Sequence, residues 1–98
     1  MNIQAMMKQA QKLQKDMMKT KEEIDDQTFE GTSSLVNVKV NGKKEILEVK
    51  IKSEELEKDD LEMLEDMIVV AVNDAMKKID KITEEKMGKF TKGMPGLF

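Results

Sequence analysis

Apolar residues recur at steps of three and four between residues 59 and 89, the longest regular pattern in the chain. These positions are Leu61, Leu64, Ile68, Ala71, Val72, Ala75, Ile79 and Ile82. The spacing predicts one long α-helix rather than a strand. Asp59 and Glu62 are spaced as a capping box that would start it, and no Gly or Pro interrupts it before Gly88. About 30 residues make a rod of about 45 Å, which must overhang a compact fold with a radius of gyration of about 13 Å.

This predicted helix is apolar on more than one side between Ile68 and Val72. A helix of that kind is normally covered on most sides. The rest of the chain supplies one other helix and a short hairpin, which is too little cover, so we expect an intertwined homodimer. We expect its interface to include Val36, Val38, Leu64, Ile68, Val72 and Ala75.

A second helix is predicted from Ile3 to about Gln27, because apolar residues form a narrow seam at the a and d positions of a heptad. The seam consists of Ile3, Met6, Ala10, Leu13, Met17 and Ile24. Four lysines follow the same steps on the opposite face, at the c and f positions: Lys8, Lys12, Lys15 and Lys19. One side of the helix would pack and the other would present a row of ammonium groups. The alternative is that this row is merely a solvated outer face.

Three short strands are predicted between the helices. Thr28–Thr32 has the composition of an edge strand, and Leu35–Val40 alternates with its valines on one face. Asn41-Gly42 predicts a tight hairpin turn, because both residues tolerate positive φ. Ile46–Lys52 would return as the third strand, and its expected buried residues are Leu47, Val49 and Ile51.

The predicted fold class is therefore α+β, in the order α-β-β-β-α, with a small antiparallel sheet and two long helices. Residues 1–90 would form a single domain, as expected for a chain of 98 residues. Residues 91–98 contain Gly and Pro, and we expect them to be a flexible tail.

The composition argues against several catalytic and metal-binding functions. The chain has no Cys, His, Trp, Tyr or Arg, so it lacks thiol chemistry and a histidine base. No Ser lies in a nucleophile motif, which argues against nucleophilic catalysis. Gly42-Lys43-Lys44 lacks the upstream Gly of a phosphate-binding P-loop. Glu84 and Glu85 would point apart on a helix, which argues against a pair of acid–base carboxylates. The acidic run of residues 54–60 lacks the spacing of a calcium loop and is better explained as a solvated, helix-capping patch. We expect no enzyme, metal site, cofactor or small-molecule substrate.

The longest apolar run, Met67–Val72, is far too short to span a membrane, and the N-terminus lacks the pattern of a signal peptide. We therefore expect a cytoplasmic protein that does not contact the membrane.

Charge is distributed unevenly along the chain, although the net charge is only -3. Residues 1–21 hold five lysines against one acid, residues 45–66 ten acids against three lysines, and residues 76–98 six lysines against three acids. Lysines at both ends can neutralise phosphates, which provides affinity without reading sequence. Without Arg to read guanine or Trp and Tyr to stack on single-stranded bases, this pattern favours duplex DNA, backbone contacts and low sequence preference.

Several segments resemble the YbaB/EbfC nucleoid-associated DNA-binding family. Residues 8–17 resemble its first helix, residues 35–42 its central hairpin, residues 59–75 its second-helix signature, and residues 91–97 its Gly/Met-rich tail. Two departures are Ser34, where the family usually has Gly, and Lys92, where a second Gly is common.

The resemblance implies a homodimer whose helical arms form a tweezer-like cleft for DNA, in the nucleoid, with a role in nucleoid organisation, gene expression or repair. Its DNA contacts lie on basic residues of the terminal helices, and the matching residues here are Lys8, Lys12, Lys15, Lys19, Lys78, Lys81, Lys86, Lys89 and Lys92. The alternative is a prefoldin-like interaction module, a helix–hairpin–helix coiled coil that grips protein clients with its helix tips.

Overall fold

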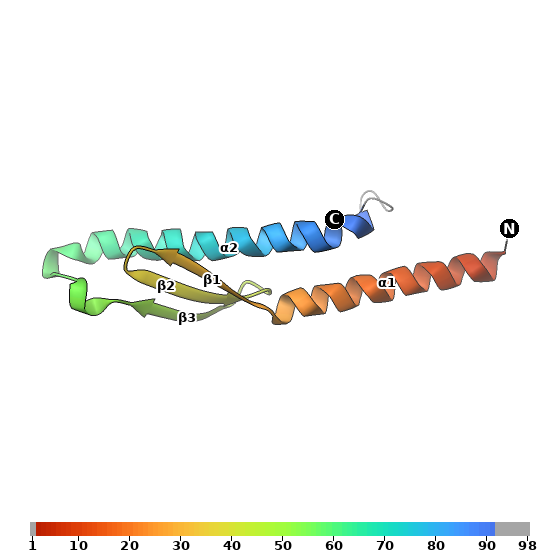
Figure 1. Ribbon diagram of the computed structural model, residues 1–98, viewed down its shortest axis with the longest axis horizontal. Helices are drawn as coiled ribbons and strands as arrows, with labels where there is room; N and C mark the ends of the chain where they lie inside the picture. The colour runs from red at the N-terminus through yellow and green to blue at the C-terminus, as the bar shows by residue number, and fades with distance from the viewer. Residues whose placement is uncertain (1, 92–98) are drawn as a thin grey trace.

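Residues 2–91 of the chain are described by a computed structural model (Figure 1). The helices and strands follow the order α1 (Ile3–Asp26), β1 (Thr28–Ser33), β2 (Val36–Asn41), β3 (Ile46–Ile51), η1 (Ser53–Glu55), η2 (Lys58–Asp60) and α2 (Leu61–Thr91). The predicted α-β-β-β-α order and α+β class are confirmed. The molecule measures 72 × 20 × 13 Å with a radius of gyration of 19.5 Å, so it is a rod rather than a globule.

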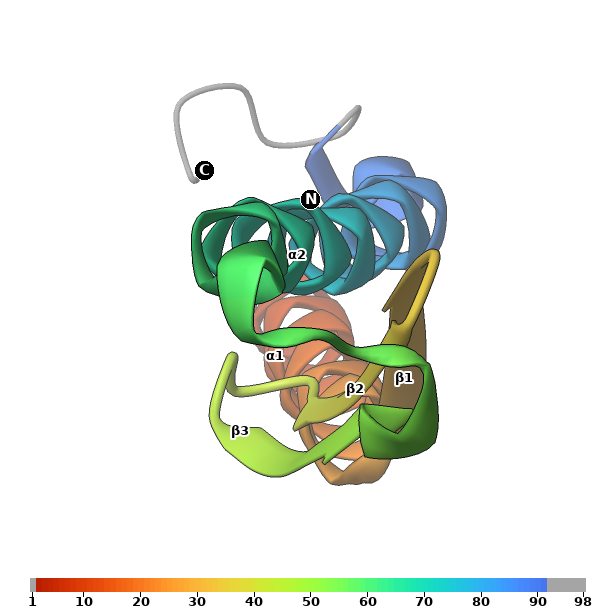
Figure 2. The same cartoon turned by 90° about the vertical axis from the view of Figure 1, so that its left-hand side faces the viewer.

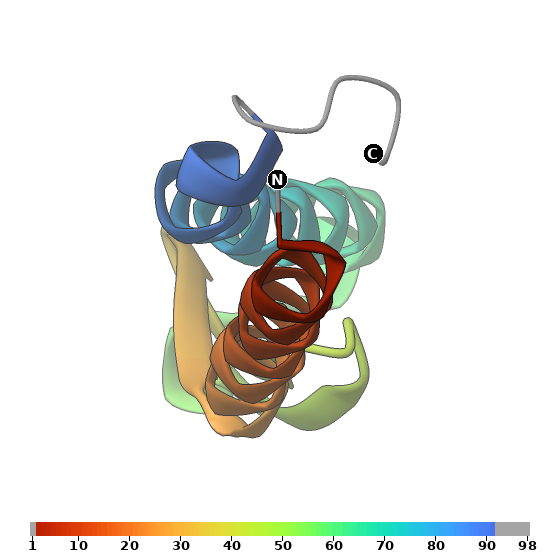
Figure 3. The same cartoon turned by 90° about the vertical axis from the view of Figure 1, so that its right-hand side faces the viewer.

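The rod has two layers. α2 forms one layer, and the sheet and α1 follow each other end to end in the other (Figure 1). α2 packs over β1 and β2 with its N-terminal two thirds and against α1 with its last turns. Figure 3 shows α1 running alongside α2 toward the viewer. The element that projects farthest beyond the body is α1, whereas the overhang was expected of the long helix α2, whose last turns pack against α1.

The three strands form an antiparallel sheet in the order β1-β2-β3. Val36, Val38 and Val40 face α2 and are buried, as their alternation predicted. Ser34 has a positive φ of 48° in the turn between β1 and β2, a conformation that Gly would adopt without strain.

The second turn differs from the prediction. Asn41 is the last residue of β2, and the only positive φ among described non-glycine residues of this turn is at Lys44, at 68°. The side-chain oxygen of Asn41 accepts hydrogen bonds from the N–H groups of Lys43 and Glu45, each at 3.0 Å. Gly42 is needed for a different reason, because a Cβ there would lie 1.8 Å from the carbonyl oxygen of Ile24. The predicted hairpin at Asn41-Gly42 is confirmed, but the expectation that these two residues supply the positive φ is wrong, because an asparagine-centred loop places it at Lys44.

The main core lies between the sheet and α2. Its buried members are Phe29, Val36, Val38, Val40, Ala71, Ala75 and Ile79. Small residues bring β1 and α2 close together, because a Cβ at Gly31 would lie 2.0 Å from the carbonyl oxygen of Ala71. The apolar stripe predicted for the long helix is confirmed over its middle, and Leu61 at its start is exposed.

β3 lies largely outside this core. Figure 2 shows β1 rising toward α2 while β3 is the strand farthest from it. Leu47, Val49 and Ile51 are 56%, 42% and 37% exposed, so the prediction that they are buried is wrong for the single chain. A register shift also pairs Ile46, and not Leu47, with Val40. The reason is geometric, since one helix is too narrow to cover three strands of a twisted sheet.

The start of α2 is capped by residues other than those predicted. η2 precedes the helix, and Glu57 and Asp60 form the capping box. The Asp60 carboxylate accepts a hydrogen bond of 2.9 Å from the Glu57 N–H. The predicted box of Asp59 and Glu62 is therefore displaced by two residues. At the other end α2 reaches Thr91, past the expected stop at Lys89.

Candidate nucleic-acid interface

Four of the five lysines of α1 form one line along the outside of the helix. Lys8, Lys12, Lys15 and Lys19 are all exposed, and none forms an ion pair with a residue that the structure describes. From Lys8 to Lys19 the row spans about 17 Å at ~1.5 Å per residue. We call these four residues the lysine stripe.

The stripe points away from the body because the opposite side of α1 is used for packing. Ile24 is buried with Met87 and Phe90, and Leu13 and Met17 pack against the same cluster. The contact sets the rotation of the helix, and the heptad then places the lysines on the far side. One side of the helix packs from Leu13 to Ile24, and the other side carries four ammonium groups that pair with no described residue.

The lysines predicted on α2 divide into two groups. Lys81, Lys86 and Lys89 are exposed. Lys78, in contrast, donates a hydrogen bond of 2.8 Å to the carbonyl oxygen of Glu30 and lies 3.4 Å from the Asp74 carboxylate. Its ammonium group links α2 to β1. Lys92 lies outside the described residues.

Asp74 is the acidic partner in this contact between α2 and β1. Its carboxylate accepts a hydrogen bond of 3.1 Å from the Thr32 N–H on β1 and pairs with Lys78. The Thr32 hydrogen bond, helped by the nearby positive charge of Lys78 and opposed by desolvation, holds the pKa of Asp74 below its ordinary value. The network ties the edge strand β1 to the long helix.

Two free lysines were missed by the sequence reasoning. Lys77 is exposed, makes no ion pair within the described chain, and lies one helical turn before Lys81. Lys77 and Lys78 lie on different faces of the helix, because Lys78 borders the apolar stripe and Lys77 does not. Lys43 is also exposed and unpaired with any described residue, and no local signal revealed where the hairpin tip would lie.

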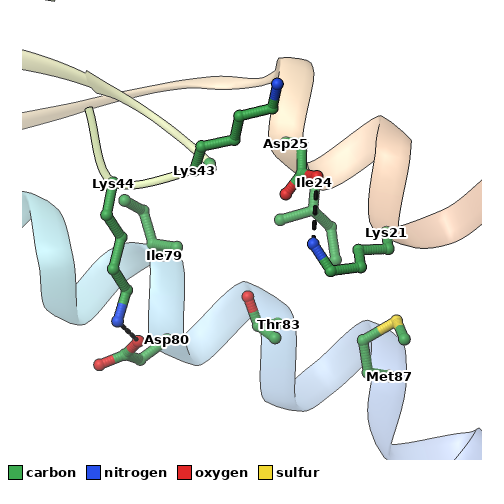
Figure 4. A pocket seen from close by; sticks show the side chains of 10 residues that line it. Lys21, Ile24, Asp25, Lys43, Lys44, Ile79, Asp80, Thr83 and Met87 are labelled. Carbon is green, nitrogen blue, oxygen red and sulfur yellow. Dashed lines mark hydrogen bonds and ion pairs between the residues drawn. The ribbon is translucent and has the colours of Figure 1, made fainter. Parts of the chain in front are cut away.

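Lys43 lies beside a pocket of about 420 Å³ at the base of α1 (Figure 4). Ile24, Ile79 and Met87 supply its apolar walls. Two ion pairs rim it, Lys21–Asp25 at 3.2 Å and Lys44–Asp80 at 3.0 Å (Figure 4). The second pair joins the hairpin to α2.

Charge is segregated along the rod. The acidic residues of η1, η2 and the first turns of α2 lie at the end opposite the N-terminus (Figure 1). The lysine stripe lies at the other end. A polyanion is therefore attracted to the α1 end and repelled from the far end.

The residues expected at the dimer interface fall into two sets. Val36, Val38 and Ala75 are buried inside the single chain, and their side chains leave almost no surface for a partner. Leu64, Ile68 and Val72 are only partly buried and pack at the margin of the core.

No group of three or more Asp or Glu residues in the described part of the chain is arranged to hold a metal ion. Neither α1 nor α2, over residues 2–91, combines the length and apolarity needed to cross a bilayer.

Comparisons with known proteins agree with the resemblance. A model of the YbaB/EbfC DNA-binding family matches residues 1–94. A nucleoid-associated protein of Bacillus licheniformis is 55% identical, covering 99% of this chain and 94% of the relative. A nucleoid-associated protein of Lactococcus lactis subsp. lactis is 50% identical, over 97% of this chain and 98% of the relative. Another, of Ligilactobacillus salivarius, is 48% identical, over 99% of this chain and 95% of the relative.

Proposed function

Because the chain belongs to the YbaB/EbfC DNA-binding family, we propose that it binds duplex DNA as a homodimer, mainly through lysine–phosphate contacts. The observation that carries this proposal is the lysine stripe, a row of four exposed and unpaired ammonium groups on a projecting helix. The relatives are named nucleoid-associated proteins, which supports a place in the nucleoid for this chain as well. A role in nucleoid organisation and gene expression is part of the same proposal.

The dimensions of the stripe suit a duplex. Duplex DNA carries one negative charge per about 1.7 Å of its axis, so a row of about 17 Å faces about ten phosphate charges. Lys81, Lys86 and Lys89, together with Lys77, add positive charge on the neighbouring helix. Lysine acts as a point charge and reads no base pattern, which supports low sequence preference.

The homodimer is supported by uncovered apolar side chains on β3 and on one flank of α2, which we call the apolar face. Ile46, Val49 and Ile51 lie across from the buried valines of β2, yet α2 does not cover them. The facing flank of α2 is identified by Asp80, which pairs with Lys44 of the β2–β3 hairpin. Steps of three and four residues back from Asp80 reach Met76, Val72 and Val69.

Val69, on that flank, is 58% exposed although it lies in the middle of α2. Clustered exposed apolar residues on a small chain are typical of an interaction site. A second copy related by a two-fold axis offers the same apolar face, so each α2 can cover the β3 of its partner.

Two matched substitutions test the dimer. Val69→Glu places a charge on the apolar face, and we expect a monomer by sedimentation. Val70→Glu makes the same change one residue on, beside Thr32 and Lys77 and outside the apolar face, and we expect it to remain dimeric. Glu favours helix, so both variants should keep their helical circular dichroism. A dimeric Val69→Glu protein would contradict this interface.

DNA binding is tested by a gel-shift titration with random duplex DNA at two salt concentrations. We expect affinity to fall steeply with salt, by about one log-log slope unit per phosphate contact. The prefoldin-like alternative binds through apolar tips and should be nearly independent of salt. Absence of binding in dilute buffer would refute the proposal.

A further inference from the structure

The apolar seam of α1 is only half used. Leu13, Met17 and Ile24 pack against α2, whereas Ile3 and Met6 are 71% and 52% exposed, and Ala10 is exposed as well. The N-terminal part of α1 projects beyond the end of α2 (Figure 1). We call residues 3–12 the arm, and Ile3, Met6 and Ala10 the arm seam. The arm seam continues an established helix–helix interface past the point where α2 ends.

The arm seam and the lysine stripe lie on opposite faces of the arm. Lys8 is two residues from both Met6 and Ala10, which is about 200° around the helix. A duplex on the stripe therefore leaves the arm seam open on the other side.

The residues flanking the arm seam favour a second copy of the same arm. The heptad positions beside it are occupied by Asn2, Met7, Gln9 and Gln14, and none is charged. In coiled coils the flanking positions set partner choice, and like charges there would keep two identical helices apart. Where α1 packs on its own α2, the flanking positions instead carry charge, at Asp16, Lys21 and Glu23.

We propose that the arm seam pairs with the arm seam of a second DNA-bound molecule, and that this pairing bridges two duplexes. Seam-to-seam contact turns the two lysine stripes outward, so each stripe holds its own duplex on one side of the paired arms. The inference rests on the proposed function, because the stripe must bind DNA first.

The contact is weak without DNA. The arm is about 15 Å long, so pairing buries far less than the about 800 Å² per partner of a standard stable interface. Molecules held on DNA reach a high local concentration, which makes the weak contact effective. Bridging should therefore appear only when DNA is well covered with protein.

A two-duplex capture assay tests the proposal. One random duplex is fixed to beads, a second carries a fluorophore, and the protein is added in increasing amounts. We expect the unaltered protein to retain the labelled duplex. The double variant Ile3→Gln, Met6→Gln should shift a single short duplex in a gel as well as the unaltered protein does, while capture falls to background.

A matched control changes two polar residues of the arm outside the seam and the stripe. Gln4→Ala with Gln11→Ala should leave both the gel shift and capture intact. Circular dichroism of each variant checks that α1 stays helical.

The outcomes separate the two proposals. Absence of a gel shift by the unaltered protein would overturn the proposed function and the bridging together. A gel shift without capture would overturn bridging alone. Capture that survives the Ile3 and Met6 substitutions would also overturn bridging through the arms. In that case a single dimer could place each of its two stripes on a different duplex, or another part of the chain could cover the seam, and neither arrangement needs the arms to pair.

Discussion

Removing the lysine stripe should lower DNA affinity by an amount that its charge count predicts. The variant carries Gln at Lys8, Lys12, Lys15 and Lys19. Each lysine that neutralises a phosphate contributes about -0.9 to the slope of log affinity against log salt. One stripe on DNA then contributes about -3.6, and both stripes of a dimer about -7.

These slopes translate into affinities that a gel shift can measure. Between 50 and 200 mM salt, one stripe accounts for a loss of about 100-fold and two stripes for a loss of about 10,000-fold. The variant should lose that dependence, and the drop in slope counts the stripes that lie on one duplex. All four side chains are exposed and unpaired within residues 2–91, so the free energy of unfolding should change by no more than about 0.5 kcal/mol per substitution.

The control removes the same charge from lysines that are already paired. It carries Gln at Lys21, Lys39, Lys44 and Lys50, each of which forms an ion pair with a described acidic residue. We expect the control to keep most of the original slope. An equal loss of slope in both variants would refute the reasoning, because binding would then follow net charge and not the stripe.

Two further predictions concern the fold. Gly31→Ala should lower the free energy of unfolding by about 1–3 kcal/mol or more, because its Cβ would collide with the backbone of Ala71. A urea titration measures this change, and an unchanged midpoint would contradict the close approach of β1 and α2. Asp74→Asn should be less stable than the unaltered protein near neutral pH. Since the folded pKa of Asp74 is depressed, its contribution is present above the ordinary value of 3.8 and lost as pH falls through the lower folded value. The gap between the two urea midpoints should therefore close in that acidic range, and a gap independent of pH would argue against the Thr32 hydrogen bond.

Much of the architecture was readable from local patterns. The steps of three and four in α1 and α2 and the alternation of Val36, Val38 and Val40 predicted the elements and which of their faces is apolar. These features depend on the period of a helix or strand, which is a property of consecutive residues. The capping box was misplaced because several acidic residues compete for that role, and their hydrogen bonds depend on the path of η2.

Some functional assignments likewise follow from the local sequence pattern, and others depend on the tertiary structure. That Lys8, Lys12, Lys15 and Lys19 share a face opposite the seam follows from the heptad alone. Lys78 contacts Glu30 and Asp74, whereas Lys77 forms no ion pair with a described residue. This difference depends on where Glu30 and Asp74 lie, and these residues meet only when the strand packs on the helix.

Periodicity states that a face is apolar or charged, and it does not state what covers that face. Val49 and Val38 belong to the same alternating pattern of the sheet, yet α2 buries Val38 and leaves Val49 exposed. Ile3 and Ile24 belong to one seam, yet only Ile24 meets α2. The order of elements and the faces of each helix were thus encoded locally, whereas exposure arose from the width of one helix, the twist of the sheet and the point at which α2 ends.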